Sequence, residues 1–380
     1  MRNTEPPRDT PAALSYNRPM TSKTPLYNLQ KGAGATFTRL AGWEVADTFG
    51  GPADEYRAAT EGSAVLDCSY MGRFNVTGKD ALDLLNRLSS NRVDPLPPGT
   101  GAATILTTNK GRVIDLLHLF AVDDRLVMLT SPETRERVAE YIDMFTFLEE
   151  ATMEDVTEAT SMITVLGPST PDVVRRVTGL PVVSLEPYSS LNVNLDGTAA
   201  MVFRTDPAGN TGYDFVVAAD RAEAAWSALV NAGASPIGER TYNAMRVEAG
   251  VPRYGWELSE TVNPWEVNLA QYINFEKGCY VGQEVILRLN TYQKVQRRMA
   301  RLSFSDATVG EGAVLRSEEK DAGIVTSWIE HPQSGEAIGL GLVRSTYATA
   351  GAELEVVDKA GEQVAVATVR EVLDRAPVLS

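Results

Sequence analysis

The stretch from residue 301 to the end constrains the fold of this chain most strongly. Short apolar segments alternate there with glycine-rich turns, and no helical period interrupts them. The six segments are ARLSFS, AVLRS, GIVTSWIE, AIGLGLV, AELEVVD and QVAVATVREV. Several short strands without a helix are typical of a small β-barrel or sandwich. We therefore expect a small all-β domain at the C-terminal end.

The preceding residues predict a mixture of helices and strands. In the first block, GRFNVTG, TGAATILTTN and VIDLLHLFAVDDRLVMLTS indicate strands, while KDALDLLNRL and PETRERVAEYIDMFTFLEE indicate helices. This order favours an antiparallel sheet with helices on one face. A second α+β block, residues 151–250, has strands in SMITVLGP and AAMVFRTD and helices in DRAEAAWSALVNAG and ERTYNAMRVEAG. Because 380 residues exceed what one core usually organises, we expect two or three domains.

The N-terminal residues and the composition restrict the cellular location of the protein and the partners it can bind. Residues 1–23 are polar and rich in proline, which predicts a flexible lead without the apolar core of a signal peptide. No apolar run in the sequence is long enough to span a bilayer. A net charge of −15 argues against binding to nucleic acid or to an anionic membrane. The two cysteines are most simply reduced thiols, so we expect a cytoplasmic protein.

Several common motifs are missing from the sequence. It contains no G-x-G-x-x-G after a strand, no G-x-x-x-x-G-K-[ST] and no H-E-x-x-H. With only His118 and His331, it has almost no material for a Ser-His-Asp triad or for a metal site built from several histidines. We therefore expect no metal, and any chemistry must use carboxylates, cysteine, tyrosine or a bound cofactor.

Asp115 is the first candidate for such chemistry. It interrupts the apolar run VIDLLHLF, where burying a carboxylate is costly unless the group meets a partner or has a function. Burial would raise its pKa, which suits proton exchange with a weakly basic nitrogen near neutral pH. The alternative is that strand alternation places Asp115 on the solvent-exposed face, and the residues alone favour neither.

The second candidate is the segment KGCYVGQE, in which glycines allow tight backbone turns. Lys277 lies close to Cys279 in sequence and could lower the pKa of its thiol, which would favour a reactive thiolate. A structural loop with a buried thiol explains the same residues. In a generic protein that simpler explanation would be preferred.

Several ordered segments resemble the glycine-cleavage T-protein (aminomethyltransferase)/YgfZ superfamily of tetrahydrofolate-binding proteins, from residue 24 to the end. They are TPLYNLQKGAGATFTRLAGWEV, VLDCSYMGRFNVTGKDALDLLNRL, NKGRVIDLL, ITVLGP, RVEAGVPRYGWELSETVNP, GIVTS and AIGLGLV. KGCYVGQE resembles the signature of the YgfZ branch. The resemblance implies an α+β fold of three domains in a cloverleaf, with folate in a central channel. It divides the chain into a lead (1–23), two interleaved α+β domains that bind folate (24–295) and a C-terminal β-barrel (296–380).

The resemblance also implies roles for individual residues. Asp115 matches the aspartate that T-proteins place near the reactive N5 of tetrahydrofolate, and Leu116 replaces its usual acidic successor. Met71 matches a position that lines the pterin pocket. YgfZ proteins generally lack an aspartate at the Asp115 position, so its presence favours a transferase.

Two positions depart from the T-protein pattern. Asn210 aligns with a glutamate that reads the pterin, and an amide could still pair with the ring edge with less charge assistance. Tyr242 aligns with an arginine that contacts folate, and it could stack on a folate ring but not pair with a carboxylate. The alternative is a diverged pocket that no longer binds folate.

These observations predict a tetrahydrofolate-dependent one-carbon transferase. It would pass a methyl or aminomethyl unit from a small donor, or from a carrier, to tetrahydrofolate, with Asp115 holding or exchanging a proton. The alternative is a non-catalytic YgfZ-type accessory protein in iron–sulfur cluster maintenance, with an iron–sulfur protein as partner and Cys279 as its working group. A demethylase acting on a sulfur or oxygen methyl compound would differ from the first hypothesis only in the donor.

Overall fold

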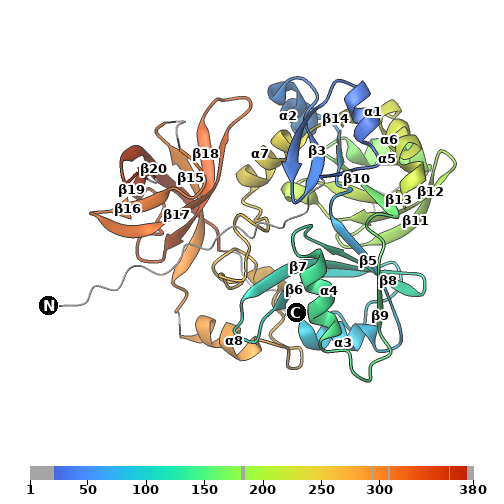
Figure 1. Cartoon of the computed structure of the whole chain (residues 1–380), viewed down its shortest axis with the longest axis horizontal. Helices are drawn as coiled ribbons and strands as arrows, with labels where there is room; N and C mark the ends of the chain where they lie inside the picture. The colour runs from blue at the N-terminus through green and yellow to red at the C-terminus, as the bar shows by residue number, and fades with distance from the viewer. Residues whose placement is uncertain (1–20, 181–184, 293, 307–308, 359, 375–380) are drawn as a thin grey trace.

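The computed structural model of the chain describes residues 21–180, 185–292, 294–306, 309–358 and 360–374. Within these residues the chain forms three open sheets and a closed barrel, and the barrel lies to one side of the two larger sheets (Figure 1). Residues 1–20 of the predicted lead lie outside the described residues. Its end is ordered, because strand β1 (Ser22–Lys23) pairs in parallel with β3 (Trp43–Thr48).

The first large sheet has five strands and carries helices on one face. Its elements are β5 (Gly72–Thr77), α3 (Ala81–Leu88), β6 (Gly101–Thr107), β7 (Val113–Val122), β8 (Arg125–Thr130), α4 (Arg135–Asp143) and β9 (Thr152–Asp155). The strand order is β6-β7-β8-β5-β9 and every pairing is antiparallel. Leu85 of α3 and Val138 of α4 pack with Leu119 of β7 in one apolar core. The predicted antiparallel sheet with helices on one face is therefore confirmed.

The second large sheet has six strands in the order β11-β12-β13-β10-β4-β14. Its elements are β4 (Ala64–Asp67), β10 (Thr160–Leu166), α5 (Thr170–Thr178), β11 (Ser190–Leu195), β12 (Thr198–Arg204), β13 (Gly212–Ala218), α6 (Ala222–Asn231) and β14 (Ser235–Pro236). Val174 of α5 and Leu229 of α6 share a buried core with Phe215 of β13. Strand β4 precedes the five-stranded sheet in sequence but lies in this one, so the chain passes between the two sheets.

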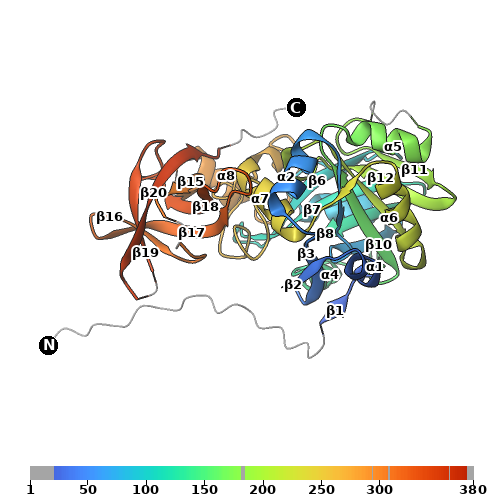
Figure 2. The ribbon, with the colours of Figure 1, turned by 90° about the horizontal axis from the view of Figure 1, so that it is seen from above.

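The remaining elements lie outside the two large sheets and the barrel. They are α1 (Tyr27–Gly32), β2 (Thr36–Leu40), α2 (Pro52–Glu61), η2 (Pro207–Gly209), η3 (Ala219–Arg221), α7 (Glu239–Ala249), η4 (Ala270–Tyr272) and α8 (Gln283–Thr291). Strands β1, β3 and β2 form the small third sheet. Helix α7 lies between the barrel and the large sheets (Figure 1 and Figure 2).

The C-terminal strands close into a six-stranded barrel. They are β15 (Arg297–Phe304), β16 (Val314–Ser317), β17 (Lys320–Glu330), β18 (Ala337–Arg344), β19 (Glu353–Val357) and β20 (Gln363–Val372), in the order β15-β18-β17-β16-β19-β20. Leu302, Val325 and Val356 fill the interior. A Cβ on Gly339 would lie 2.2 Å from the carbonyl oxygen of Ser327, so glycine permits the close pairing of β17 with β18. Of the two expected architectures, the barrel is confirmed.

Helix α8 was not expected from the sequence. Ile286 is its one buried residue, so the helix shows little apolar period. Gly282 precedes it with a left-handed φ of +85°, and a Cβ there would lie 2.5 Å from the carbonyl oxygen of Thr108. The second glycine of KGCYVGQE therefore lets the chain turn against the β6–β7 connection.

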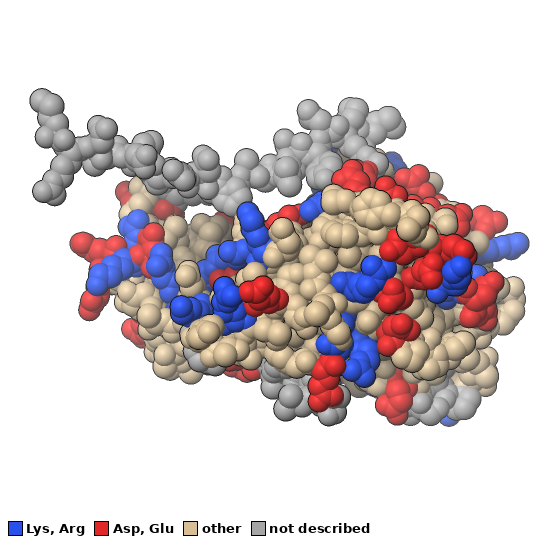
Figure 3. Space-filling model, turned by 90° about the horizontal axis from the view of Figure 1, so that it is seen from below, with Lys and Arg blue, Asp and Glu red and all other residues tan. Residues whose placement is uncertain are grey.

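The surface carries charges of both signs. Acidic and basic side chains are interspersed over the face shown in Figure 3. Among the described residues, no helix has the length and apolar character that crossing a membrane requires.

Candidate functional site

A cavity of about 240 Å³ lies where the two large sheets meet α7 and the irregular chain around residues 250–272. We call it the central cavity. Leu116 and His118 of β7, Asp214 of β13, Tyr242 of α7 and Arg253 all line it. Its walls therefore come from segments far apart in the sequence, which only the completed fold brings together.

The carboxylate of Asp115 is fully buried but does not line this cavity. Its Oδ2 accepts hydrogen bonds from the backbone N–H of Ser131 (2.8 Å) and the hydroxyl of Thr134 (2.5 Å). Its Oδ1 accepts from the Ser131 hydroxyl (2.7 Å) and the Leu116 N–H (2.9 Å). Burial raises the pKa of Asp115 to about 6, although these hydrogen bonds oppose the rise.

The backbone explains this position of Asp115. The pairing of β6 with β7 shifts register between Leu106 and Thr107, opposite Asp115, which is the mark of a β-bulge. Beyond the bulge, successive side chains of β7 point to opposite faces of the sheet. Leu116 and His118 therefore line the cavity, whereas Asp115 contacts Thr134 at the beginning of α4. The solvent-exposed alternative for Asp115 is wrong. Direct contact of Asp115 with a ligand in the cavity is not supported either, because Leu116 occupies the cavity face.

Asp214 places a carboxylate in the cavity wall. It is 4% exposed, and its two oxygens accept hydrogen bonds from the hydroxyls of Thr164 (2.5 Å) and Thr205 (2.7 Å). Burial raises its pKa to about 6, and the two hydroxyls lower it. Each oxygen accepts one of these bonds and retains further acceptor capacity. Asp214 can therefore bind a ligand group that donates two hydrogen bonds side by side.

Aromatic side chains form much of the remaining wall. Tyr242, which the sequence predicts as a folate-binding residue, lines the cavity together with Tyr188, Tyr254 and Tyr272. Met71, the other predicted pocket residue, also lines it. Burial raises the pKa of Tyr242 well above its usual value, so its hydroxyl stays neutral. Such walls suit a flat ring system.

Three buried polar atoms of cavity residues have no hydrogen-bond partner among the described residues. They are Nδ1 of His118, Oε2 of Glu133 and Oε1 of Gln271. Burial lowers the pKa of His118 to about 4, so its ring is neutral at physiological pH. Because buried polar groups are normally paired, their convergence here indicates a polar ligand.

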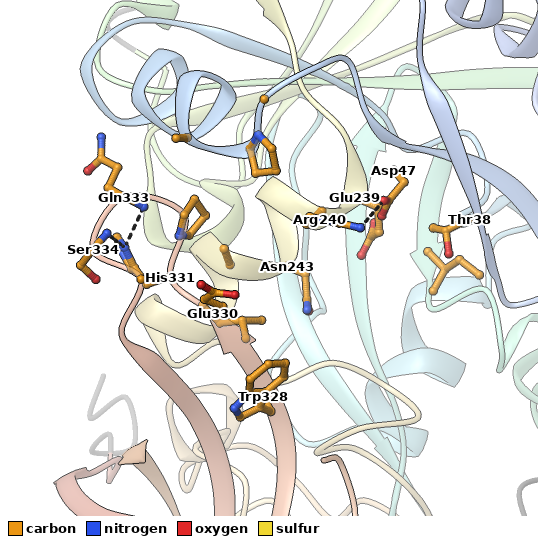
Figure 4. A pocket seen from close by; sticks show the side chains of 18 of the residues that line it. Thr38, Asp47, Glu239, Arg240, Asn243, Trp328, Glu330, His331, Gln333 and Ser334 are labelled. Atoms are coloured by element: carbon orange, nitrogen blue, oxygen red, sulfur yellow. Dashed lines mark hydrogen bonds and ion pairs between the residues drawn. The ribbon is translucent and has the colours of Figure 1, made fainter. Parts of the chain in front are cut away.

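A wider cavity of about 880 Å³, which we call the outer cleft, lies between α2, α7 and the β17–β18 hairpin. In Figure 4, His331, Gln333 and Ser334 of the hairpin lie at one end of the cleft and Asp47 and Thr38 at the other, with residues of α7 between them. Arg253 of the central cavity forms an ion pair with Glu239 of the outer cleft. Its guanidinium also lies 5.0 Å from the ring centre of Trp256, which lines the cleft. These contacts form a wall between the two spaces.

Besides Asp115, three more predicted site residues lie outside the central cavity. Asn210 does not line it, and its side-chain amide donates to the carbonyl of Ala208 (3.1 Å). The Lys277 ammonium donates to the carbonyls of Asn86, Ser89 and Asn91 at 2.5–2.7 Å, so its position is explained by chain packing. Burial lowers its pKa to about 8. Cys279 is an exposed free thiol away from the cavity.

The sequence interpretation missed Asp214, Glu133 and Arg253. Asp214 could have been noticed as a carboxylate within the apolar strand GYDFVVA, the same kind of signal that marked Asp115. Glu133 and Arg253 had no comparable pattern around them. No group of three or more His, Cys, Asp or Glu within the described ranges is arranged to hold a metal ion.

Comparisons with known proteins cover nearly the whole chain. Residues 26–277 match the GCVT N-terminal domain, and residues 297–374 match the glycine cleavage T-protein C-terminal barrel domain. The aminomethyltransferase of Thermotoga neapolitana is 28% identical over 341 residues, which covers 88% of this chain and 93% of that protein. The aminomethyltransferase of Geobacillus kaustophilus is 28% identical over 347 residues, with coverage of 89% and 94%.

A solved structure has the same fold. Glycine cleavage system aminomethyltransferase T from Bartonella henselae superimposes with a TM-score of 0.83 at 21% identity, over 94% of this chain and 99% of that one. The two domain matches together account for both α+β sheets and the barrel. The chain therefore belongs to the glycine cleavage T-protein family, as its sequence resemblance predicts.

Proposed function

We propose that this protein is a tetrahydrofolate-dependent one-carbon transferase that passes a methyl or aminomethyl unit from a small donor, or from a carrier, to folate in the central cavity. The observation that carries this proposal is the cavity itself, which is lined by a buried carboxylate, tyrosine rings and polar atoms that have no hydrogen-bond partner in the described part of the chain. Tetrahydrofolate is the cofactor of the family, and when bound it supplies a nucleophilic ring nitrogen that receives the one-carbon unit.

The residues of the cavity fit a pterin ring. A pterin presents a ring N–H and an amino group side by side as donors, and a carboxylate with two oxygens accepts both. We assign this role to Asp214, in place of the one that the sequence suggested for Asn210. The rings of Tyr242, Tyr188 and Tyr272 provide apolar surface for the two faces of the pterin.

The residues of the protein position the ligand and exclude water from the cavity. Asp214 is held by two threonine hydroxyls, so it is oriented before any ligand arrives. Leu116 and Met71 add apolar surface to the wall, which excludes water and strengthens each polar contact inside. This arrangement suits a transfer that water would divert into hydrolysis.

The accessory-protein alternative rests on KGCYVGQE and Cys279. The relatives matched over nearly the whole chain are named aminomethyltransferases, which favours the transferase. The exposed Cys279 thiol remains available to a partner, and a function that requires this thiol without folate turnover would support the alternative.

Both cysteines are unpaired, which supports the predicted cytoplasmic location.

A transfer assay in the reverse direction tests the proposal. The purified protein is given 5,10-methylenetetrahydrofolate with ammonium and a small dithiol, and release of tetrahydrofolate is followed. We expect turnover in the parent and a loss of about tenfold or more in kcat/KM for Asp214→Asn, which removes a charge-assisted hydrogen bond. Asp196→Asn, at the exposed turn between β11 and β12, is the matched control and should behave as the parent. Equal losses in both variants would count against the proposed site.

A further inference from the structure

Glu133 brings a second carboxyl group into the central cavity. It lies just before α4, after Ser131 and Pro132, and its side chain lines the cavity. Its Oε2 is buried and has no hydrogen-bond partner among the described residues. Buried carboxyl oxygens are normally paired, so this atom is placed to meet a ligand group.

Asp115 and Thr134 hold this carboxyl group in place. Three of the four hydrogen bonds that Asp115 accepts come from Ser131 and Thr134, which lie two residues before and one residue after Glu133. The Asp115 carboxylate itself does not line the cavity. Its hydrogen bonds instead hold the turn that carries Glu133.

The surroundings of Glu133 keep its pKa near neutral pH. Burial raises the pKa of Glu133 to about 7, and the carboxylates of Asp115 and Glu239 also raise it. Arg253 and the backbone N–H of Glu133 lower it. Arg253 is already paired with Glu239, which limits how strongly it attracts the Glu133 carboxyl. Tyr254, whose pKa is raised by burial, also interacts with Glu133 and stays neutral.

We propose that Glu133 is the carboxyl group that exchanges a proton with folate during one-carbon transfer. This inference rests on the proposed function and assigns to Glu133 the role that the sequence suggested for Asp115. Leu116, on the cavity face of β7, has no proton to exchange, so the carboxyl comes instead from the turn before α4.

The proton transfer balances with the transfer of the one-carbon unit. The folate nitrogen forms a bond to the carbon, and the bond between that carbon and the donor atom breaks with its electron pair on the donor atom. The proton of the folate N–H passes to the ionised Glu133 carboxylate. Glu133 then gives the proton to the departing donor atom and returns to its ionised form. No oxidant is required.

The test compares Glu133→Gln with the parent in folate binding, proton exchange and turnover. Titration calorimetry with tetrahydrofolate at pH 7, in buffers of different ionisation heat, gives the affinity and the number of protons exchanged. We expect Glu133→Gln to bind with an affinity within about threefold of the parent but to lose most of the proton exchange, leaving the smaller part that comes from Asp214. Its kcat in the reverse transfer assay should fall about a hundredfold or more, the usual contribution of a proton-transferring group.

Two further variants make the result decisive. Glu140→Gln, on an exposed position of α4, removes the same charge away from the cavity and should match the parent. Glu133→Asp keeps a carboxyl group and should restore the proton exchange and part of the turnover, whereas a merely structural role would give no such rescue. Retained folate binding shows that each variant is folded.

The outcomes separate this inference from the proposed function. If the parent binds and turns over folate and Glu133→Gln keeps both its turnover and its proton exchange, the role of Glu133 is wrong and the proposed function stands. A parent protein that neither binds nor turns over folate would overturn the proposed function, and the role of Glu133 with it.

Discussion

The protonation state of Asp214 should control the affinity for folate. Its pKa is raised to about 6 by burial, and its ionised form is the one that accepts both hydrogen bonds from a pterin. Above pH 7 the dissociation constant should be nearly independent of this group. Below pH 6 it should rise about tenfold for each pH unit, because a proton must be removed before binding. Calorimetric titration with tetrahydrofolate between pH 5 and pH 8 measures this slope.

The Asp214→Asn variant separates this residue from other titrating groups. It should bind folate more weakly at pH 8 and lose the part of the weakening below pH 6 that comes from Asp214, while any dependence that comes from Glu133 remains. The folding stability of the free protein depends on pH in the opposite direction to the folate affinity. The folded-state pKa lies above the unfolded value, so the contribution of Asp214 to stability is lost as the pH rises from about 4 to 6. If the dissociation constant of Asp214→Asn rose below pH 6 as steeply as that of the parent, Asp214 would not be the group that controls folate affinity.

The sequence identified Asp115 as an unusual carboxylate but not the face it occupies. The pattern VIDLLHLF shows that a charge lies within an apolar strand, and the structure supplies the buried partners that such a charge needs. Which side it faces depends on a register shift in the pairing with β6, a property of two strands together. No pattern within β7 alone contains that information.

At the level of elements, one buried ionic cluster fastens α7 to the barrel. Arg246 of α7 donates to Glu257 (2.7 Å) and to Ser327 of β17 (2.7 Å). Glu257 also accepts from the hydroxyls of Ser327 (2.6 Å) and Thr326 (2.8 Å). All but Thr326 are at most 1% exposed. Because Arg246 also lines the central cavity, this cluster fixes the cavity wall against the barrel.

Neutralising Glu257 should be strongly destabilising. In Glu257→Gln, the Arg246 charge stays buried without its carboxylate, which typically costs about 3–5 kcal/mol. Urea unfolding measures this loss. Hydrogen exchange should show lost protection in β17 and α7 first. The control is Glu284→Gln, which breaks the exposed pair with Arg288 and should cost less than about 1 kcal/mol. Comparable losses in the two variants would contradict a special role for the cluster.

Sequence patterns predicted elements best where one face is apolar. Helix α3, whose Leu84, Leu85 and Leu88 are buried, and the barrel strands follow directly from apolar periodicity. Helix α8 and the chain from residue 251 to 282 do not, because few of their residues follow a single buried face. That irregular chain nevertheless contributes Arg253, Tyr254 and Tyr272 to the cavity. Much of the site therefore lies where periodicity gives the least information.

At the scale of the whole molecule, the central cavity forms because the chain passes back and forth between the two large sheets. Strand β4 joins the second large sheet although the next strand, β5, belongs to the first, and Tyr70 and Met71, between these two strands, line one cavity with Asp214 and Tyr242. The resemblance of ordered segments predicted the family, the fold class and folate as cofactor. Met71 and Tyr242, which it assigned to the folate site, line the cavity, whereas Asn210 does not and donates its amide to Ala208 in the η2 turn (Pro207–Gly209).

The central claim is that tetrahydrofolate binds in this cavity, between Tyr242 and Asp214. The most direct measurement is calorimetric titration of the parent, Tyr242→Ala and Asn210→Ala with tetrahydrofolate at pH 7.5. Our account predicts micromolar binding in the parent, a loss of about tenfold or more in Tyr242→Ala from lost ring stacking, and little change in Asn210→Ala. A parent without measurable affinity, or a loss confined to Asn210→Ala, would contradict it.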